Sequence, residues 1–114
     1  MTLDPRLPAD PLAFIREKVR AADIFWTYHV NMRLQRRFIT RRCILESVDT
    51  YEIIESYPAD KYLPSYLILA QHGGKMFHVL FAVDVVGDNV RVVTAYRPNP
   101  DEWQPDLKTR RKTP

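Results

Sequence analysis

The sequence predicts an α+β domain in which N-terminal helices pack on one face of a four-stranded antiparallel sheet. Up to Thr50 the apolar residues recur at helical spacing, whereas after Thr50 they form short runs separated by turn signals. The chain has 114 residues, of which 46% are hydrophobic and 27% are charged. This length and composition are typical of one globular domain with its own core.

Three helices are predicted before Thr50. Asp10 is placed to cap the first, with Pro11 at its first position, and this helix runs to about Ala22. The second spans Tyr28 to about Phe38, and Thr40 is placed to cap the third. Their expected buried positions are Leu12, Ile15 and Val19, then Val30, Leu34 and Phe38, then Ile44, Leu45 and Val48.

Four strands are predicted after Thr50, joined as an antiparallel meander. Turns are expected at Gly73-Gly74 and around Gly87-Asp88-Asn89, and three prolines, Pro98, Pro100 and Pro105, prevent regular structure afterwards. The expected strands are Tyr51–Tyr57, Ser65–Gln71, Met76–Val85 and Val90–Arg97. Residues 1–9 are expected to form a flexible lead, 10–107 the domain and 108–114 a basic tail.

The last hairpin allows a prediction of which residues share a face. With a loop of two or four residues, the apolar face carries Phe77, Val79, Phe81 and Val83 with Val92, Thr94 and Tyr96. The opposite face carries His78, Leu80, Ala82 and Asp84 with Arg91, Val93, Ala95 and Arg97. His78 is then expected beside Arg97, and Asp84 beside Arg91. A three-residue loop would move every partner to the opposite face.

An imidazole beside a guanidinium suits cleavage of a phosphodiester, which needs a proton-transfer group and a cation for the developing charge. His78 and Arg97 are therefore candidate catalytic residues. A half-exposed histidine in an ordinary cross-strand pair explains the same pattern. Asp84 and Arg91 are expected to form a surface salt bridge.

The arginines indicate an anionic partner. Between Ile24 and Arg42 there is no acid, and 12 of the 17 basic residues in the chain are arginine, the side chain suited to bidentate phosphate contacts. The arginines of this segment are Arg33, Arg36, Arg37, Arg41 and Arg42, and His29 lies on the same expected helix strip. These arginines are candidate RNA-binding residues and His29 is a third catalytic candidate. A solvated helix face or an acidic partner protein would fit the same pattern.

Several classes of function are disfavoured. Cys43 is the only cysteine, which excludes an internal disulfide and a multi-cysteine metal site, and the three histidines are scattered. We therefore expect no metal site, and no phosphate-binding loop motif indicates a nucleotide cofactor. Cys43 is expected to be a structural thiol and His72 a turn residue. We see no secretory signal or membrane span, which favours a cytoplasmic protein.

Several short motifs, taken in their order and spacing, match one known family. They are Trp26-Thr27-Tyr28-His29-Val30 with Arg33, Leu34, Arg37 and Ile39, then Glu55-Ser56-Tyr57-Pro58, His78-Val79-Leu80 and Val93-Thr94-Ala95-Tyr96-Arg97-Pro98, and the closing Trp103 and Lys108–Lys112. In these motifs the sequence resembles the family called domain of unknown function 4258. Val30 stands where the family usually has alanine, and Phe38 stands where it often has glycine.

The family is similar to the small RelE-like and BrnT-like toxins of bacterial toxin–antitoxin pairs, in which helices pack on a curved antiparallel sheet and RNA is cut. The resemblance implies RNA or the ribosome as partner, and an antitoxin-like zinc-finger or helix-turn-helix protein as a second one. The positions it carries over are His29, Arg33, Arg37, Thr94, Tyr96 and Arg97. Tyr96 is a candidate for stacking on a base.

We therefore expect a toxin-like RNA-binding domain that cleaves RNA as a metal-independent endoribonuclease. The alternative is a non-enzymatic protein-interaction module whose basic face docks an acidic partner. An inactive family member kept as a regulator is a third possibility.

Overall fold

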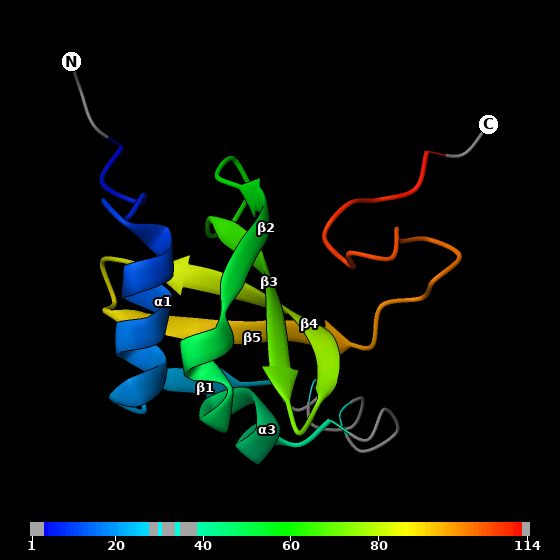
Figure 1. Cartoon of the computed structure of the whole chain (residues 1–114). Helices are drawn as coiled ribbons and strands as arrows, with labels where there is room; N and C mark the ends of the chain where they lie inside the picture. Colours follow the sequence, from blue (N-terminus) through cyan, green and yellow to red (C-terminus); the bar gives the residue numbers. More distant parts are fainter. Residues whose placement is uncertain (1–3, 28–29, 31–33, 35–38, 113–114) are drawn as a thin grey trace.

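A computed structural model describes residues 4–27, 30, 34 and 39–112 of the chain. It contains five strands and, among these residues, two α-helices and one 3-10 helix, shown in Figure 1. The elements are α1 (Pro11–Arg20), β1 (Ile24–Trp26), α3 (Arg41–Glu46), η1 (Val48–Thr50), β2 (Glu52–Tyr57), β3 (Ser65–His72), β4 (Lys75–Asp84) and β5 (Asn89–Tyr96). No helix among these residues is long and apolar enough to cross a membrane.

The helix starts are those that the sequence predicts. The Asp10 carboxylate accepts a hydrogen bond from the N–H of Ala13 at 3.1 Å, and Pro11 occupies the first helical position of α1. Thr40 caps α3 by accepting from the N–H of Cys43 at 3.0 Å. Leu45, expected in the core, is instead exposed, because the six-residue α3 turns only Ile44 fully inward.

The helix expected over residues 28–38 lies mostly outside the described residues. Val30 and Leu34, which are described, are buried in the main core, as their spacing predicts. The third position of that stripe, Phe38, lies outside the described residues.

The sheet has five strands in the order β1-β5-β4-β3-β2, not the expected four antiparallel ones. The meander from β2 to β5 is antiparallel, as predicted, but β1 adds to its edge parallel to β5. The sequence conceals β1 because a strand of three residues is too short to show alternation. Its partner also lies at the far end of the chain.

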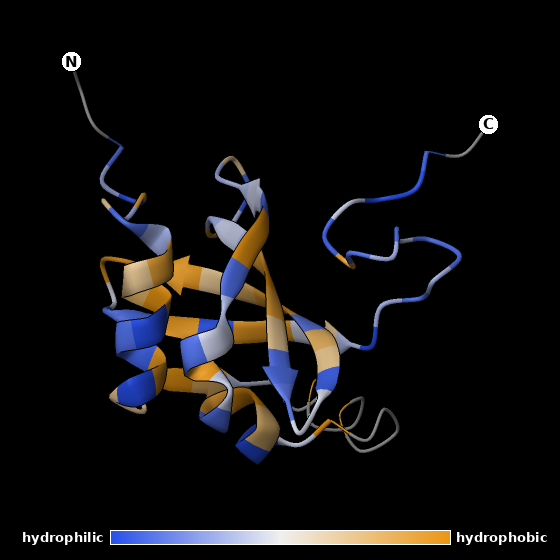
Figure 2. Cartoon of the chain, in the orientation of Figure 1, coloured by the Kyte–Doolittle hydropathy of each residue, from blue (hydrophilic) through white to orange (hydrophobic). Residues whose placement is uncertain are grey.

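The main core fills the space between α1, α3 and one face of the sheet, where the apolar colouring in Figure 2 is concentrated. The prediction that Phe77, Val79, Phe81 and Val83 share this face with Val92 is confirmed, since all five are buried in the main core. The β4–β5 loop has four residues between the paired Asp84 and Asn89, so this part of the register is the expected one. Arg91 pairs with Asp84 at 3.3 Å, also as predicted.

A β-bulge in β5 changes the register beyond that point. The pairing steps from Phe81 with Val92 to Leu80 with Thr94, which leaves Val93 as the extra residue. Beyond the bulge the two strands pair even with even positions. His78 therefore pairs with Tyr96, and the expectation that it lies beside Arg97 is wrong.

After β5 the chain crosses to the other face of the sheet, away from α1 (Figure 1). Residues 97–112, here called the C-terminal segment, contain no helix or strand but only one isolated bridge, between Trp103 and Arg110. Trp103 is 1% exposed, and its ring meets that of His78 edge-on at 4.5 Å. The sheet is thus covered on both faces, by helices on one and in part by this segment on the other.

Candidate functional site

His78, the first catalytic candidate, is fully buried in β4 beneath the C-terminal segment. Its Nε2 lies 2.7 Å from the carbonyl oxygen of Leu107, and its Nδ1 lies 3.3 Å from the hydroxyl of Tyr96. Because a carbonyl only accepts, Nε2 carries the proton and Nδ1 accepts from Tyr96. Burial lowers the pKa of His78, which favours this neutral form. In this arrangement neither ring nitrogen is open to a substrate.

Tyr96, the candidate for stacking on RNA, shares that environment. Its ring meets the ring of His78 at 5.3 Å, and burial raises the pKa of its hydroxyl. The sequence places Tyr96 on the helix-facing side, but the bulge at Val93 puts it on the opposite face. Its partner there is His78, the residue that also bonds to Leu107 in the C-terminal segment.

Four of the predicted residues, His29, Arg33, Arg36 and Arg37, lie outside the described residues. The two remaining arginines of that group start α3. The Arg42 guanidinium pairs with Glu46 one helical turn later at 2.9 Å, and the Arg41 guanidinium lies over the ring of Trp26 at 5.0 Å. Both arginines are exposed.

The bulge sends Arg97 to the helix side of the sheet, into a cleft of about 280 Å³. The cleft lies between α3 and the β3–β4 hairpin. Its lining comprises Ile39, Cys43, His72, Gly73, Lys75, Phe77 and Arg97. Thus the cleft gathers an imidazole, a thiol and two cations from three separate parts of the chain.

The β3–β4 hairpin fixes the position of two of these groups. His72 pairs with Lys75 across a loop of only Gly73 and Gly74, which have φ of 59° and 76°. Such a two-residue loop needs positive φ at both positions, and only glycine adopts it without strain. Residues paired in this way project from the same face, so the imidazole and the ammonium group stand side by side.

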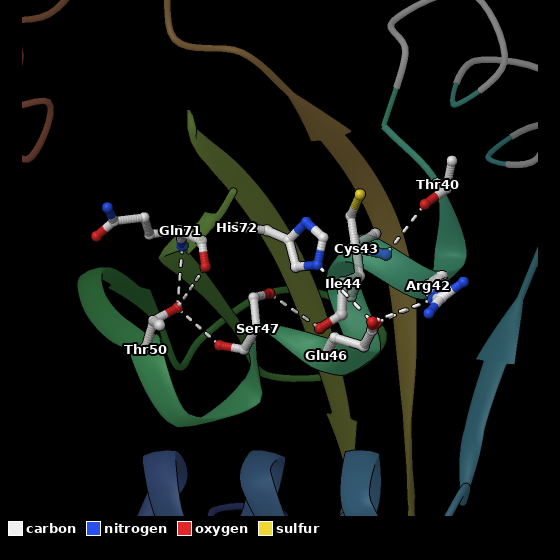
Figure 3. Close-up of polar contacts among 9 residues, drawn as sticks. All are labelled: Thr40, Arg42, Cys43, Ile44, Glu46, Ser47, Thr50, Gln71 and His72. Atoms are coloured by element: carbon white, nitrogen blue, oxygen red, sulfur yellow. Dashed lines mark hydrogen bonds and ion pairs between the residues drawn. The ribbon is translucent and has the colours of Figure 1, made fainter. Parts of the chain in front are cut away.

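The end of β3 that carries His72 is held by Thr50 in η1 (Figure 3). The N–H of Gln71 donates to the Thr50 hydroxyl oxygen at 2.9 Å, and that hydroxyl donates to the carbonyl of Ser47 at 2.7 Å. A further contact joins it to the carbonyl of Gln71 at 3.4 Å. One side chain therefore ties the hairpin to the helices.

An acid stands beside the imidazole. The His72 Nε2 lies 3.9 Å from a carboxylate oxygen of Glu46 on α3, and Figure 3 shows the two side chains facing one another. A carboxylate that faces a ring nitrogen helps to orient the imidazole. Lys75 and Arg97, by contrast, are exposed and form no ion pair with any residue that the structure describes.

A sequence comparison places this chain among known proteins. The family described as "Domain of unknown function (DUF4258)" matches residues 26–97, which is more than half of the chain. This chain belongs to the DUF4258 family. Neither curated proteins nor solved structures gave a match.

The DUF4258 match begins in β1 and ends at Arg97, so it contains every residue that lines the cleft. The C-terminal segment that buries His78 lies almost wholly beyond it. The comparison identifies the family and assigns no activity to it.

Chemically, the cleft of this DUF4258 protein combines two capacities. Lys75 and Arg97, which form no ion pair with a described residue, offer positive charge to an oxyanion. His72, beside Glu46, offers an imidazole that can accept or donate a proton. Among the described residues no three His, Cys, Asp or Glu side chains gather as metal ligands would.

The sequence predicts a functional role for Arg97 but not for its neighbours in the cleft. It predicts His72 only as a turn residue, although the run His72-Gly73-Gly74-Lys75 itself indicates the pairing. A two-residue glycine loop makes the flanking residues cross-strand partners, which places a histidine beside a lysine. Nothing local in the sequence indicates that Glu46 and Arg97 join them.

Proposed function

We propose that this DUF4258 protein is a toxin-like RNA-binding domain that cleaves RNA in the cleft beneath α3. The observation that carries the proposal is the cross-strand pair of His72 and Lys75, with Arg97 on the same cleft wall. Unpaired cations beside an imidazole meet the two demands of phosphodiester cleavage, charge neutralisation and proton transfer.

In this reaction neutral His72 takes the proton of the ribose 2′-hydroxyl, whose oxygen bonds to the adjacent phosphorus. Arg97 neutralises the charge that develops on the non-bridging oxygens, since its planar fork fits two of them. Lys75 gives a proton to the departing 5′-oxygen as the phosphorus–oxygen bond breaks. The products are a 2′,3′-cyclic phosphate and a 5′-hydroxyl, and solvent returns the proton from His72 to Lys75.

The surroundings of the cleft fit an RNA ligand. Arg41 and Arg42 start the helix that forms one wall, so a strand leaving the cleft passes two exposed guanidinium groups, of which that of Arg42 already pairs with Glu46. We propose the bacterial cytoplasm as the location, RNA alone or on the ribosome as substrate, and an antitoxin-like zinc-finger or helix-turn-helix protein as the restraining partner. These assignments follow the resemblance to RelE-like and BrnT-like toxins.

The test compares cleavage of single-stranded RNA by the wild type and by three variants, His72→Ala, Lys75→Ala and Arg97→Ala. We expect each to lose at least about a hundredfold in rate, the lower range for removing a proton-transfer group or an oxyanion donor. Lys112→Ala is the matched control, because it removes an exposed cation far along the chain from the cleft. End-group analysis should find the cyclic phosphate.

Binding is measured separately with a 2′-deoxy strand, which cannot form the cyclic product. Full cleavage by His72→Ala would refute the assignment of the site. A folded wild type that binds RNA without cutting it would reduce the proposal to RNA binding. A folded wild type that neither binds nor cuts RNA would favour the alternative, in which the basic surface docks an acidic protein.

A further inference from the structure

A second opening lies on the other face of the sheet, away from the helices and the cleft. It is a groove of about 720 Å³ between the 60–63 loop and β5, with Ser65, Leu80 and Ala82 along its floor. The pairing of the strands explains its shape. One row of paired residues crosses all five strands with large side chains at both ends and small ones in the middle: Phe25, Arg91, Ala82, Ser65 and Tyr57.

Large apolar side chains stand exposed around this groove. Tyr62 is 82% exposed, Phe25 58% and Val93 43%. The C-terminal segment covers the His78 end of the same sheet face but leaves this end open. Apolar side chains clustered about a groove on a small domain mark an interaction surface.

The charges on the rim select the partner. Lys61 stands on the loop side and Arg91 on the strand side. Lys61 forms no ion pair with a described residue, and Arg91 shares its charge with Asp84. Asp60, the acid of the lining, is engaged by the Ser65 hydroxyl. Around its apolar walls the groove therefore presents two cations and one carboxylate, which is a net positive charge.

The chain's own cover of the neighbouring surface shows the converse pattern. There the buried Trp103 is followed by Lys108 and Arg110, which pair with Glu52 at 3.1 Å and Glu55 at 2.7 Å. An apolar anchor followed by two basic residues thus covers the part of the sheet that has an acidic rim. By the same complementarity, the part with a basic rim fits an apolar anchor with acidic flanks.

We propose that this groove docks a segment of a partner protein whose apolar side chains are flanked by carboxylates. The apolar side chains lie against Leu80 and Val93, and the carboxylates meet Lys61 and Arg91. The apolar floor favours a protein over RNA, because Leu80 and Ala82 offer no hydrogen bonds to bases or phosphates. This proposal stands whether or not the cleft cleaves RNA.

The test is selection from a library of random peptides displayed on phage, with the wild type as target and Val93→Glu for counter-selection. We expect the enriched peptides to combine apolar residues with aspartate or glutamate and to bind Val93→Glu at least about tenfold more weakly. Val86→Glu is the matched control, because Val86 is 83% exposed and does not line the groove. Circular dichroism verifies the fold, and Tyr62→Ala replaces Val93→Glu if that variant unfolds.

Charge reversal provides the second arm. In the double variant Lys61→Glu and Arg91→Glu, the preference should switch from acidic to basic peptides. Enrichment of basic peptides by the wild type, or binding that none of these substitutions weakens, would overturn the proposal. Self-association in solution that Val93→Glu abolishes would also overturn it, because a second copy of the chain would then be the occupant. Displacement of bound peptide by RNA would overturn it as well.

Discussion

His78 holds the C-terminal segment on the sheet, and replacing it should cost folding stability. His78→Ala removes the hydrogen bonds to Leu107 and Tyr96 and the edge-on contact with Trp103. Two buried hydrogen bonds at about 1 kcal/mol each, with about 1 kcal/mol for the ring contact, give a loss of about 3 kcal/mol before any cavity term. Because the side chain is fully buried, the cavity left by alanine brings the expected loss to about 4 kcal/mol.

The assay is urea unfolding followed by tryptophan fluorescence, in which Trp103 reports directly on this contact. His78→Gln is the informative second variant, since its amide nitrogen can still donate to the carbonyl of Leu107. It should recover about 1 kcal/mol of the loss. His72→Ala is the comparison, and it should cost less than about 1 kcal/mol because His72 is half-exposed. A His78→Ala protein as stable as the wild type but unable to cleave RNA would refute this reasoning and make His78 the catalytic histidine.

Three further predictions follow from the same contacts. Acid should lower the free energy of unfolding in two stages. Because the pKa of His78 is lowered in the folded state, stability falls as the pH drops below the ordinary 6.5, and because the pKa of Glu55 is also lowered, more is lost below 4.5. In a stability–pH profile, His78→Gln should flatten the first stage. Thr50→Val removes the hydroxyl that ties the hairpin to the helices, so it should lower the free energy of unfolding by about 1–2 kcal/mol and also slow RNA cleavage. Thr50→Ser keeps the hydroxyl and should retain both stability and cleavage in parallel assays. Binding of the 2′-deoxy strand should weaken with salt, and Arg97→Ala should reduce the slope of log affinity against log salt by about one.

Much of the fold follows from local signals in the sequence. The cap at Asp10, the cap at Thr40 and the glycine turn at Gly73-Gly74 each need only neighbouring residues, and each is where the pattern places it. The strand β1 does not follow, because a three-residue strand acquires its structure from β5, far along the chain. Local propensity carries no information about such a pairing.

The candidate site was harder to predict, for a reason that Val93 makes clear. Period-two alternation assigns each residue of a strand to a face, and one bulge inverts the assignment for everything beyond it. Nothing in the run from Val90 to Arg97 indicates a bulge, since valine at either position suits a strand. The alternation therefore paired Arg97 with His78, and the structure instead assigns it to the cleft with His72.

The bulge is required by the core on both of its sides. Val90 and Val92 before it and Ala95 after it all point into the main core, which strict alternation could not achieve across an interval of three residues. With that constraint met, the successive residues Tyr96 and Arg97 project to opposite faces. Tyr96 contacts His78, which holds the C-terminal segment, and Arg97 supplies charge to the cleft. Because these roles lie on opposite faces, substitutions of Arg97 should alter RNA binding without loosening the C-terminal segment, and substitutions of His78 should loosen that segment first.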